Sequence, residues 1–578
     1  MVRLYRYIYS PEKRWESLHC RRQLARSNAF APILAISVSL FGTSYTYNSL
    51  MAFVAAMITA VASAVSVLLL RAVWVTLSCY FLTPMRIRRT MAAQGVHGPP
   101  PRPLVGNLRQ VSALVAEANA GDMTSLSHDI VGRLMPHYVR WSQTYGKLFV
   151  YWYGSEPRLC LTDTDLIKEF LSSKYAHATG KSWLQRQGTK NFIGRGLLMA
   201  NGARWSHQRH VVAPAFMPDK LKGRVGHMVE CTKQTILSLR DAAARGRGET
   251  EIGGHMTRLT GDIISRTEFD TSYDTGKRIF HLLEDLQRLT ARSSRYLWIP
   301  GSQYFPSKYR REIGRLNGEL EGVVLESIRR SREIADEGRT TSTYGRGLLA
   351  MLLAEMEKKR EKGAGDDGKF SYDTRMVIDE CKTFFFAGHE TSALLLTWTL
   401  MLLATHPEWQ DKARAEVAQV CGDDPPSADQ LSKLTVLQMI IHETLRLYPP
   451  ATLLPRMAFE DIRLGDLHLP RGLSVWIPVL AIHHDESIWG ADAHEFNPER
   501  FAAGRRSSAG AGRFLPFAAG PRNCVGQAYA LFEAKVVLAM LLANFRFTIS
   551  DDYRHAPVNV LTLRPKYGVP VHLRPLRP

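Results

Sequence analysis

Signals for disulfide bonds, repeats and nucleic-acid binding are scarce in this 578-residue sequence. Its seven cysteines, at positions 20, 79, 160, 231, 381, 421 and 524, show no paired spacing, so neither a disulfide framework nor a zinc site is expected. No repeat, long linker or low-complexity tract follows Leu104, which favours one large domain over the roughly three or four that length alone suggests. The net charge of +20 accompanies no nucleic-acid motif, so we expect a membrane surface or an acidic protein as partner, and no nucleic acid.

Charged residues are absent between Ser27 and Leu70, and the sequence from residue 50 to 85 is largely apolar. This stretch is long enough to span a bilayer as a single helix. Arginines stand at positions 71, 86, 88 and 89, so the positive-inside rule places the body of the protein in the cytosol. A cleaved signal peptide is disfavoured, because the apolar stretch is too long and too far from the start.

The first 26 residues carry seven basic and two acidic side chains, a bias that opposes their placement in a lumen. Three explanations stay open: a second, marginal span at residues 30–41, a translation start at Met51, or a targeting peptide. We favour the start at Met51, which makes residues 1–49 an extension that is untranslated or disordered. Residues 50–85 are then the membrane anchor, and residues 86–107 form a basic, proline-rich hinge that proline stiffens.

A turn near the C-terminus, Phe517-Ala-Ala-Gly-Pro-Arg-Asn-Cys-Val-Gly526, sets one cysteine between glycines. A thiolate that binds a metal needs a lowered thiol pKa, which the metal and nearby donors supply. Gly520 and Gly526 permit close approach of the backbone, so that main-chain N–H groups can point at the sulfur of Cys524. The run is similar at every fixed position to the heme-thiolate loop of the cytochrome P450 family. The resemblance implies that Cys524 is the axial ligand of heme b, that Phe517, Gly520 and Gly526 belong to the heme site, and that Arg522 pairs with a propionate.

A long buried helix is predicted around residues 379–403, and a small and polar segment, Ala387-Gly-His-Glu-Thr-Ser392, interrupts its apolar run. Burying an acid and two hydroxyls is costly unless they are hydrogen-bonded or functional. The segment resembles the oxygen-binding helix of cytochromes P450. That resemblance implies that Ala387 and Gly388 leave room for dioxygen, and that Glu390 and Thr391 deliver protons to it through water.

A second helix is predicted to stop at Pro449 and Pro450, with Glu443 and Arg446 on one face. A Glu-x-x-Arg pair alone is a weak signal, because such pairs are common on solvated helices. The resemblance implies that these two side chains join Arg500 in a buried structural cluster that holds the loop before the heme ligand.

Trp205 and Arg209 stand four residues apart, on one face of a predicted helix. In the family such a pair donates to a propionate, and Arg456 falls where another propionate partner is often found; a surface arginine is the alternative for Arg456. The resemblance covers about Pro99 to Pro578. It implies a mainly α (α+β) cytochrome P450 fold behind the transmembrane helix, with residues 108–578 as the heme-thiolate catalytic domain.

Three stretches, 447–461, 476–484 and 553–568, look like the plant cytokinin hydroxylases. These enzymes hydroxylate the trans methyl of the isopentenyl side chain of isopentenyladenine, mainly as its nucleotides, to give trans-zeatin forms. The resemblance implies a mostly aliphatic substrate pocket that includes Ala451, Thr452, Leu453, Leu454, Leu561 and Thr562. A basic loop with Lys181, Arg186, Lys190 and Arg195 could meet a nucleotide phosphate, although an exposed basic loop without a ligand is the stronger alternative.

No Gly-x-Gly-x-x-Gly follows a predicted strand, so the two electrons for hydroxylation must come from a separate protein. In the family that partner is the membrane-bound NADPH–cytochrome P450 reductase, which implies an endoplasmic reticulum membrane location with a cytosolic catalytic domain. Basic residues near the cysteine loop could form the docking face for this acidic partner: Arg505, Arg506, Arg513 and Lys535.

Three other functions are weighed against cytokinin hydroxylation. The first is a monooxygenase of the same plant clan that acts on a terpenoid, steroid or fatty acid. The second is a heme-thiolate isomerase or dehydratase, against which Glu390 and Thr391 argue, because such enzymes need no proton relay to dioxygen. The third, a non-catalytic heme protein, has little use for that relay or for a membrane anchor beside a reductase.

Overall fold

The computed structural model describes residues 47–244, 249–269, 271, 273–294, 307–336, 347–361, 372–502 and 512–576. The chain divides into two compact units, of which the first ends at Ser78 and the second extends from Cys79 to the C-terminus. The second unit carries every residue of the predicted heme site. The two units are described separately below.

The N-terminal helix α4 (Tyr47–Leu77) is followed by a short π-helix, η2 (Ser78–Leu82), and by α5 (Thr83–Ala92). The helical run Met51–Ala92 has a mean hydropathy of 2.5 in its most apolar window, none of which is buried in protein. A helix with this many exposed aliphatic side chains is suited to lipid and not to water. The finding supports membrane anchoring. One other described helix, α23, is apolar enough to cross a bilayer, but it is mostly buried in the core.

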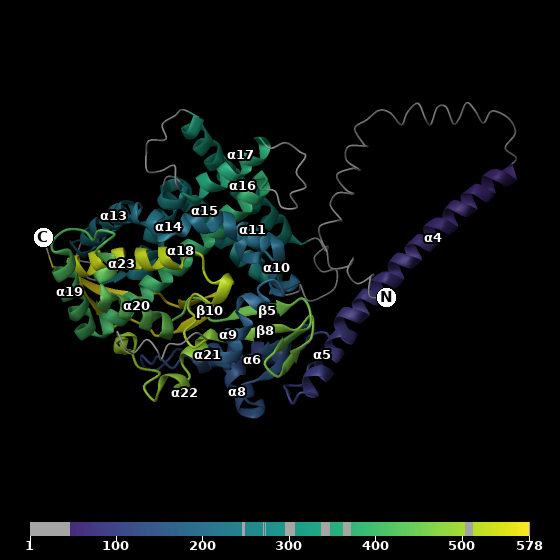
Figure 1. Ribbon diagram of the computed structural model, residues 1–578, viewed down its shortest axis with the longest axis horizontal. Helices are drawn as coiled ribbons and strands as arrows, with labels where there is room; N and C mark the ends of the chain where they lie inside the picture. The colour runs from purple at the N-terminus through teal and green to yellow at the C-terminus, as the bar shows by residue number, and fades with distance from the viewer. Residues whose placement is uncertain are drawn as a thin grey trace. The chain divides into compact units, whose positions relative to one another are not determined.

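Helices make up most of the second unit, which confirms the predicted mainly α fold with some strands (Figure 1). Their bounds are α6 (Leu108–Ala118), α7 (Val131–Leu134), α8 (Pro136–Tyr145), α9 (Thr164–Phe170), α10 (Trp183–Thr189), α11 (Gly202–Val212), α12 (Pro218–Lys222), α13 (Val225–Ala244), α14 (Ile252–Phe269), α15 (Tyr273–Ser294), α16 (Lys308–Asp336), α17 (Leu348–Glu361), α18 (Thr374–Thr405), α19 (Pro407–Cys421), α20 (Thr435–Leu447), α21 (Val479–His483), α22 (Glu486–Trp489) and α23 (Gln527–Asn544).

Four small sheets accompany the helices. The largest has the strand order β1-β2-β8-β5-β3, a second has the order β4-β12-β9, and β6–β7 and β10–β11 are two-stranded. The strand bounds are β1 (Phe149–Tyr153), β2 (Glu156–Cys160), β3 (Thr179–Gly180), β4 (Glu249–Glu251), β5 (Leu454–Ala458), β6 (Ile462–Leu464), β7 (Leu467–Leu469), β8 (Ser474–Ile477), β9 (Phe545–Ile549), β10 (Pro557–Val560), β11 (Thr562–Pro565) and β12 (Pro570–Pro575). In Figure 1, α13 to α17 gather on the side of the unit opposite β5 and β8.

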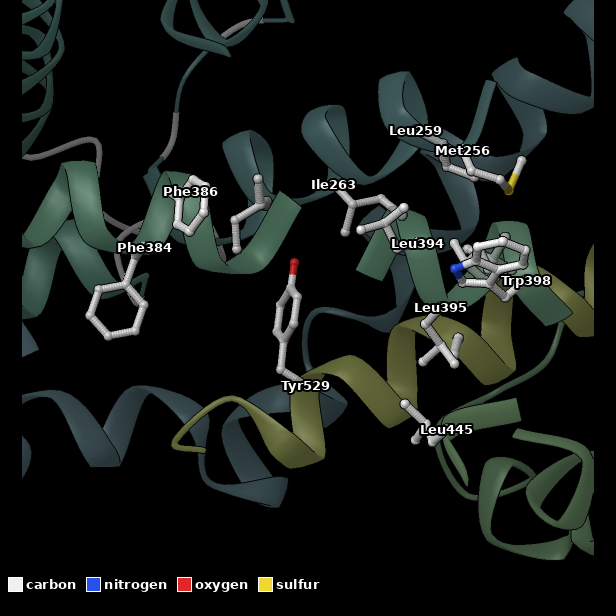
Figure 2. Close-up of a cluster of buried hydrophobic side chains, with 14 of the residues drawn as sticks. Met256, Leu259, Ile263, Phe384, Phe386, Leu394, Leu395, Trp398, Leu445 and Tyr529 are labelled. Atoms are coloured by element: carbon white, nitrogen blue, oxygen red, sulfur yellow. The ribbon is translucent and has the colours of Figure 1, made fainter. Parts of the chain in front are cut away.

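The 32-residue helix α18 is the centre of the core. The side chain of Asp373 caps its start by accepting a hydrogen bond from the N–H of Met376 (2.7 Å). The helix packs against α14, α20 and α23. Figure 2 shows the interface between α14 and α18, where Ile263 lies close to Leu394 and other buried apolar side chains. Burial on all sides explains why the sequence of α18 is largely apolar, although Asp379, Glu380 and Lys382 are also buried in it.

Helix α20 ends at Leu447, before the two prolines, and carries a buried ion pair. Arg446 donates from Nε to Glu443 Oε2 (2.8 Å) and from Nη2 to Glu443 Oε1 (2.7 Å), and neither side chain is exposed. Arg500 Nε lies 3.5 Å from Glu443 Oε1. Arg446 also donates to the carbonyls of His483 (2.8 Å) and Ala493 (2.6 Å), so the cluster ties α20 to the segment that leads to the cysteine loop.

Candidate functional site

Helix α18 has one accessible window in an otherwise buried surface. From Met376 to Ala404 every residue is buried except Ala387, Gly388, His389 and Thr391. A Cβ placed on Gly388 would lie 2.8 Å from Ile264 Cδ1 of α14, so close packing between the two helices also restricts the size of this residue. The accessible residues of α18 thus include Ala387 and Thr391, which were both predicted to lie beside a ligand.

The loop before α23 is held in a narrow range of conformations. The N–H of Cys524 donates to the carbonyl of Phe517 (2.8 Å), which closes the turn. Gly520 has φ +70°, and a Cβ there would lie 1.8 Å from the carbonyl oxygen of Leu171. The left-handed backbone and the lack of space beside Leu171 both exclude a side chain at position 520. At Gly526, in contrast, an added Cβ would meet no protein atom within 4 Å, so protein packing does not require that glycine.

Cys524 faces accessible space although protein surrounds it. Its side chain is exposed, yet burial raises the pKa of its thiol, against the opposing effects of the Gly526 N–H and the Arg209 guanidinium. Both observations fit a side chain that lines an internal cavity. Burial favours the neutral thiol, and a bound metal cation would oppose this effect and favour the thiolate.

Helix α11 supports this loop from the side. Arg209 donates from Nη1 to the carbonyl of Asn523 (2.6 Å) and from Nη2 to its Oδ1 (2.7 Å), so it fixes the residue before Cys524. The guanidinium carbon of Arg522 lies 4.2 Å from the ring centre of Trp205, which is buried. The predicted propionate partners Trp205 and Arg209 thus contact the loop itself.

Three cationic side chains gather beside the loop. Burial and then repulsion by Arg456 lower the pKa of Arg522 to about 9, and burial lowers the pKa of Arg456 to about 10. The pKa of Lys181 is lowered by burial and by both arginines. Across the described ranges no carboxylate forms an ion pair with any of the three, and Arg522 Nη2 is a buried donor without an acceptor. Buried cations in this arrangement need an anionic ligand.

The residues therefore fit a group that combines a metal ion with carboxylates, as heme does. The side chain of Cys524 is accessible, and the cations Lys181, Arg456 and Arg522 can hold carboxylates beside the loop. Helix α23 begins three residues after Cys524 and packs on α18, and its residue Tyr529 points toward that helix (Figure 2). Sequence reasoning had assigned Lys181 to a substrate phosphate, and no local motif signals its position beside the arginines.

The predicted proton relay is arranged differently from the expectation. Thr391 Oγ1 donates to the carbonyl of Ala387 (2.7 Å), one turn earlier in α18. The Oε1 atom of Glu390 pairs with Arg564 Nη2 (2.6 Å) and also accepts from the hydroxyl of Thr562. The carboxylate is thus held against β11, and Thr562 is buried with it instead of lining open space. Arg564, 174 residues from Glu390 in the chain, was missed because no sequence pattern connects the two.

The remaining pocket candidates converge on one hairpin. The N–H of Leu563 in β11 donates to the carbonyl of Pro450 (3.1 Å), which places the β10–β11 hairpin beside the segment 451–454. Ala451 and Leu561 are exposed, Leu453 and Leu454 are partly exposed, and Thr452 is buried. Leu561 occupies the tip of the hairpin with φ +71°. The structure thus joins two stretches about 110 residues apart into one mainly aliphatic surface.

The structure places other predicted basic groups as follows, and Lys535 alone among those described departs from the prediction. Arg195 Nε lies 3.6 Å from Asp379 Oδ2, so this loop residue is paired with α18. Lys535 is buried and donates to the carbonyl of Leu431 (2.7 Å), which contradicts its predicted place on a docking face. Arg513 is exposed, as such a face requires. Arg505 and Arg506 lie outside the described residues.

Comparison with known proteins agrees with this geometry. The model of the family described as Cytochrome P450 matches residues 96–570. Two Arabidopsis thaliana proteins, both described as Cytokinin hydroxylase, are 57% identical to this chain over 509 residues (88% of this chain, 96% of the relative) and 513 residues (89% and 97%). Secologanin synthase 2 of Catharanthus roseus is 37% identical over 514 residues, 88% of this chain and 96% of that protein.

Replacement of Gly520 by alanine tests the importance of the loop conformation. We expect Gly520→Ala to lower the free energy of unfolding by about 1–2 kcal/mol for the left-handed backbone alone, and further for the contact with the Leu171 carbonyl. Thermal unfolding measures the effect. Gly121→Ala is the control, because its Cβ meets no atom within 4 Å. Equal stability of the two variants would contradict the argument.

Proposed function

Because the chain belongs to the cytochrome P450 family, we propose that it is a heme-thiolate monooxygenase that hydroxylates isopentenyladenine-type cytokinins. It acts on the trans methyl of the isopentenyl side chain, mainly of the nucleotides, to give trans-zeatin forms. Two relatives with 57% identity over almost their whole length are described as cytokinin hydroxylases. The observation that carries the chemistry is the accessible thiol of Cys524 in its glycine-flanked loop, next to the cations Lys181, Arg456 and Arg522.

Each residue around the loop has a part in holding the cofactor. Heme, when bound through a thiolate, supplies the activation of dioxygen and the insertion of one oxygen atom into a C–H bond. Cys524 would provide the sulfur ligand, and Lys181, Arg456 and Arg522 would bind the propionates. Gly520 sets the turn against Leu171, and Phe517 closes it through its carbonyl. Arg209 keeps Asn523, and with it the sulfur, in position.

The substrate side is formed by aliphatic side chains that exclude water. Ala451, Leu453, Leu454 and Leu561 present carbon atoms suited to a prenyl arm, and Ala387 leaves space on α18. Exclusion of water directs the reaction to the bound methyl group.

Proton transfer at this site is assigned to Thr391 and Glu390. The hydroxyl of Thr391 is held by the Ala387 carbonyl (2.7 Å), which keeps its oxygen at the edge of the accessible window. Glu390 is the nearest acid in sequence, and its ion pair with Arg564 must open before the carboxylate can turn toward Thr391. Proton transfer then runs from Glu390, through water, to the Oγ1 atom of Thr391.

Electrons come from NADPH through a separate cytochrome P450 reductase at the endoplasmic reticulum membrane. The apolar helix Met51–Ala92 supports anchoring as a single-pass protein beside that enzyme. Arg513, exposed ahead of Cys524, belongs to the proposed docking face, whereas Lys535 does not. Attraction between such a basic face and an acidic partner weakens as the salt concentration rises.

Turnover of a cytokinin nucleotide tests the proposal. Microsomes that carry the chain, with a plant reductase and NADPH, are incubated with isopentenyladenosine monophosphate, and trans- and cis-zeatin products are separated by chromatography. We expect the trans-zeatin nucleotide. If no product forms although the carbon monoxide spectrum is normal, the protein is a monooxygenase for another substrate, to be sought among terpenoids, steroids and fatty acids.

Removal of the Thr391 hydroxyl separates electron use from product formation. In Thr391→Ala we expect unchanged heme content and continued NADPH consumption, while zeatin formation falls about tenfold to a hundredfold, because the proton donor is lost. Released hydrogen peroxide measures the difference. Thr391→Ser keeps the hydroxyl and should restore most of the coupling; equal coupling in wild type and Thr391→Ala would refute the role.

A further inference from the structure

One exposed amide near the substrate surface is held rigidly. Asn559 Nδ2 donates to Thr452 Oγ1 (2.7 Å), and Thr452 itself is buried, with 2% of its surface exposed. Asn559 is exposed, and this is the one hydrogen bond that its side chain makes to any described residue. A carboxamide has two N–H donors and one carbonyl acceptor. One N–H and the carbonyl oxygen of Asn559 therefore remain for a ligand, in an orientation that Thr452 fixes.

The position of this amide connects it to the proposed pocket. Asn559 lies on β10 opposite Leu563 of β11, and the N–H of Leu563 bonds to the carbonyl of Pro450. The next two residues, Val560 and Leu561, are apolar and exposed by 54% and 51%. The same hairpin reaches α18 through Thr562 and Glu390. A polar group bonded to Thr452 thus stands at the edge of an aliphatic surface, on a hairpin whose other strand contacts α18.

The free N–H and the carbonyl oxygen of Asn559 match one edge of adenine. An asparagine side chain can form two hydrogen bonds with adenine, accepting from N6–H and donating to N7. A prenylated N6 retains one hydrogen, and this hydrogen points to the N7 side when the prenyl arm lies on the N1 side. Thr452 takes one N–H of the carboxamide, so the contact to adenine requires that this is the N–H anti to the carbonyl oxygen, which leaves the N–H beside that oxygen for N7.

We propose that Asn559 recognises the N6–H and N7 edge of the adenine ring, and that Thr452 is a positioning residue for it. The inference rests on the proposed cytokinin substrate and specifies how that substrate is selected. A terpenoid, steroid or fatty acid offers no such edge, so binding it would leave the amide without partners. Sites built to hydrogen-bond a substrate N–H discriminate strongly against molecules that lack it.

The test compares two substrates in wild type, in three test variants and in one control variant. Wild type, Asn559→Leu, Thr452→Val and the double variant are titrated with isopentenyladenosine monophosphate and its 7-deaza analogue, in which C–H replaces N7. The binding constant is read from the substrate-induced change in the heme spectrum, and kcat/KM from zeatin formation. Asp551→Ala is the control, because this exposed residue lies eight positions away in a turn. The carbon monoxide spectrum confirms that each variant holds its heme.

The expected result is a specific loss of purine recognition. Asn559→Leu weakens binding of the natural nucleotide about tenfold or more, which corresponds to the loss of a two-bond contact to a base. Wild type loses affinity for the 7-deaza analogue, whereas Asn559→Leu binds both compounds equally. Thr452→Val has a smaller effect and adds nothing in the double variant, because it acts through Asn559.

Two results would overturn the inference, and they are distinguishable. If wild type forms zeatin but Asn559→Leu binds and reacts as wild type does, another residue reads the purine and the proposed function stands. If wild type neither binds nor hydroxylates the nucleotide while its carbon monoxide spectrum is normal, the proposed substrate is wrong and the role of Asn559 fails with it.

Discussion

Among the described residues, three partly or fully buried cations that form no ion pair with a carboxylate impose the strongest physical constraint. Burial lowers the pKa of Arg456 to about 10, and burial followed by repulsion from Arg456 lowers the pKa of Arg522 to about 9. Burial and then repulsion from both arginines also lower the pKa of Lys181. Charges in such surroundings are stable only when a ligand of opposite sign completes them. We place the cysteine loop, the buried Trp205 and the accessible window of α18 around the same ligand site.

The fold brings this ligand site together from distant parts of the chain. Arg446 and Glu443 fix the segment before the loop, Gly520 presses the loop against Leu171, and α23 continues directly from it into the core. The helix α18 is buried from Met376 to Ala404 except at its accessible window. Rigid packing on both sides keeps the sulfur and the substrate surface in register, which a monooxygenase requires for selective attack on one methyl group.

Short motifs allowed much of this to be predicted from the sequence. The helix at α18, the end of α20 before Pro449 and the residues of the Cys524 loop depend on local patterns of apolar residues, prolines and glycines. Pairings across long separations could not be predicted in the same way. Glu390 with Arg564 and Lys181 with the two arginines depend on tertiary packing, and the buried state of Lys535 depends on which face of α23 meets the core.

The carbon monoxide difference spectrum of the reduced protein tests the central claim most directly. Wild type should bind heme and give the thiolate type of spectrum, because the sulfur of Cys524 lines the cavity beside the three cations. Cys524→Ala should lose that spectrum while its far-UV circular dichroism shows that the helices are intact. A thiolate-type spectrum that persists in Cys524→Ala would show that another residue holds the heme, and would contradict the account.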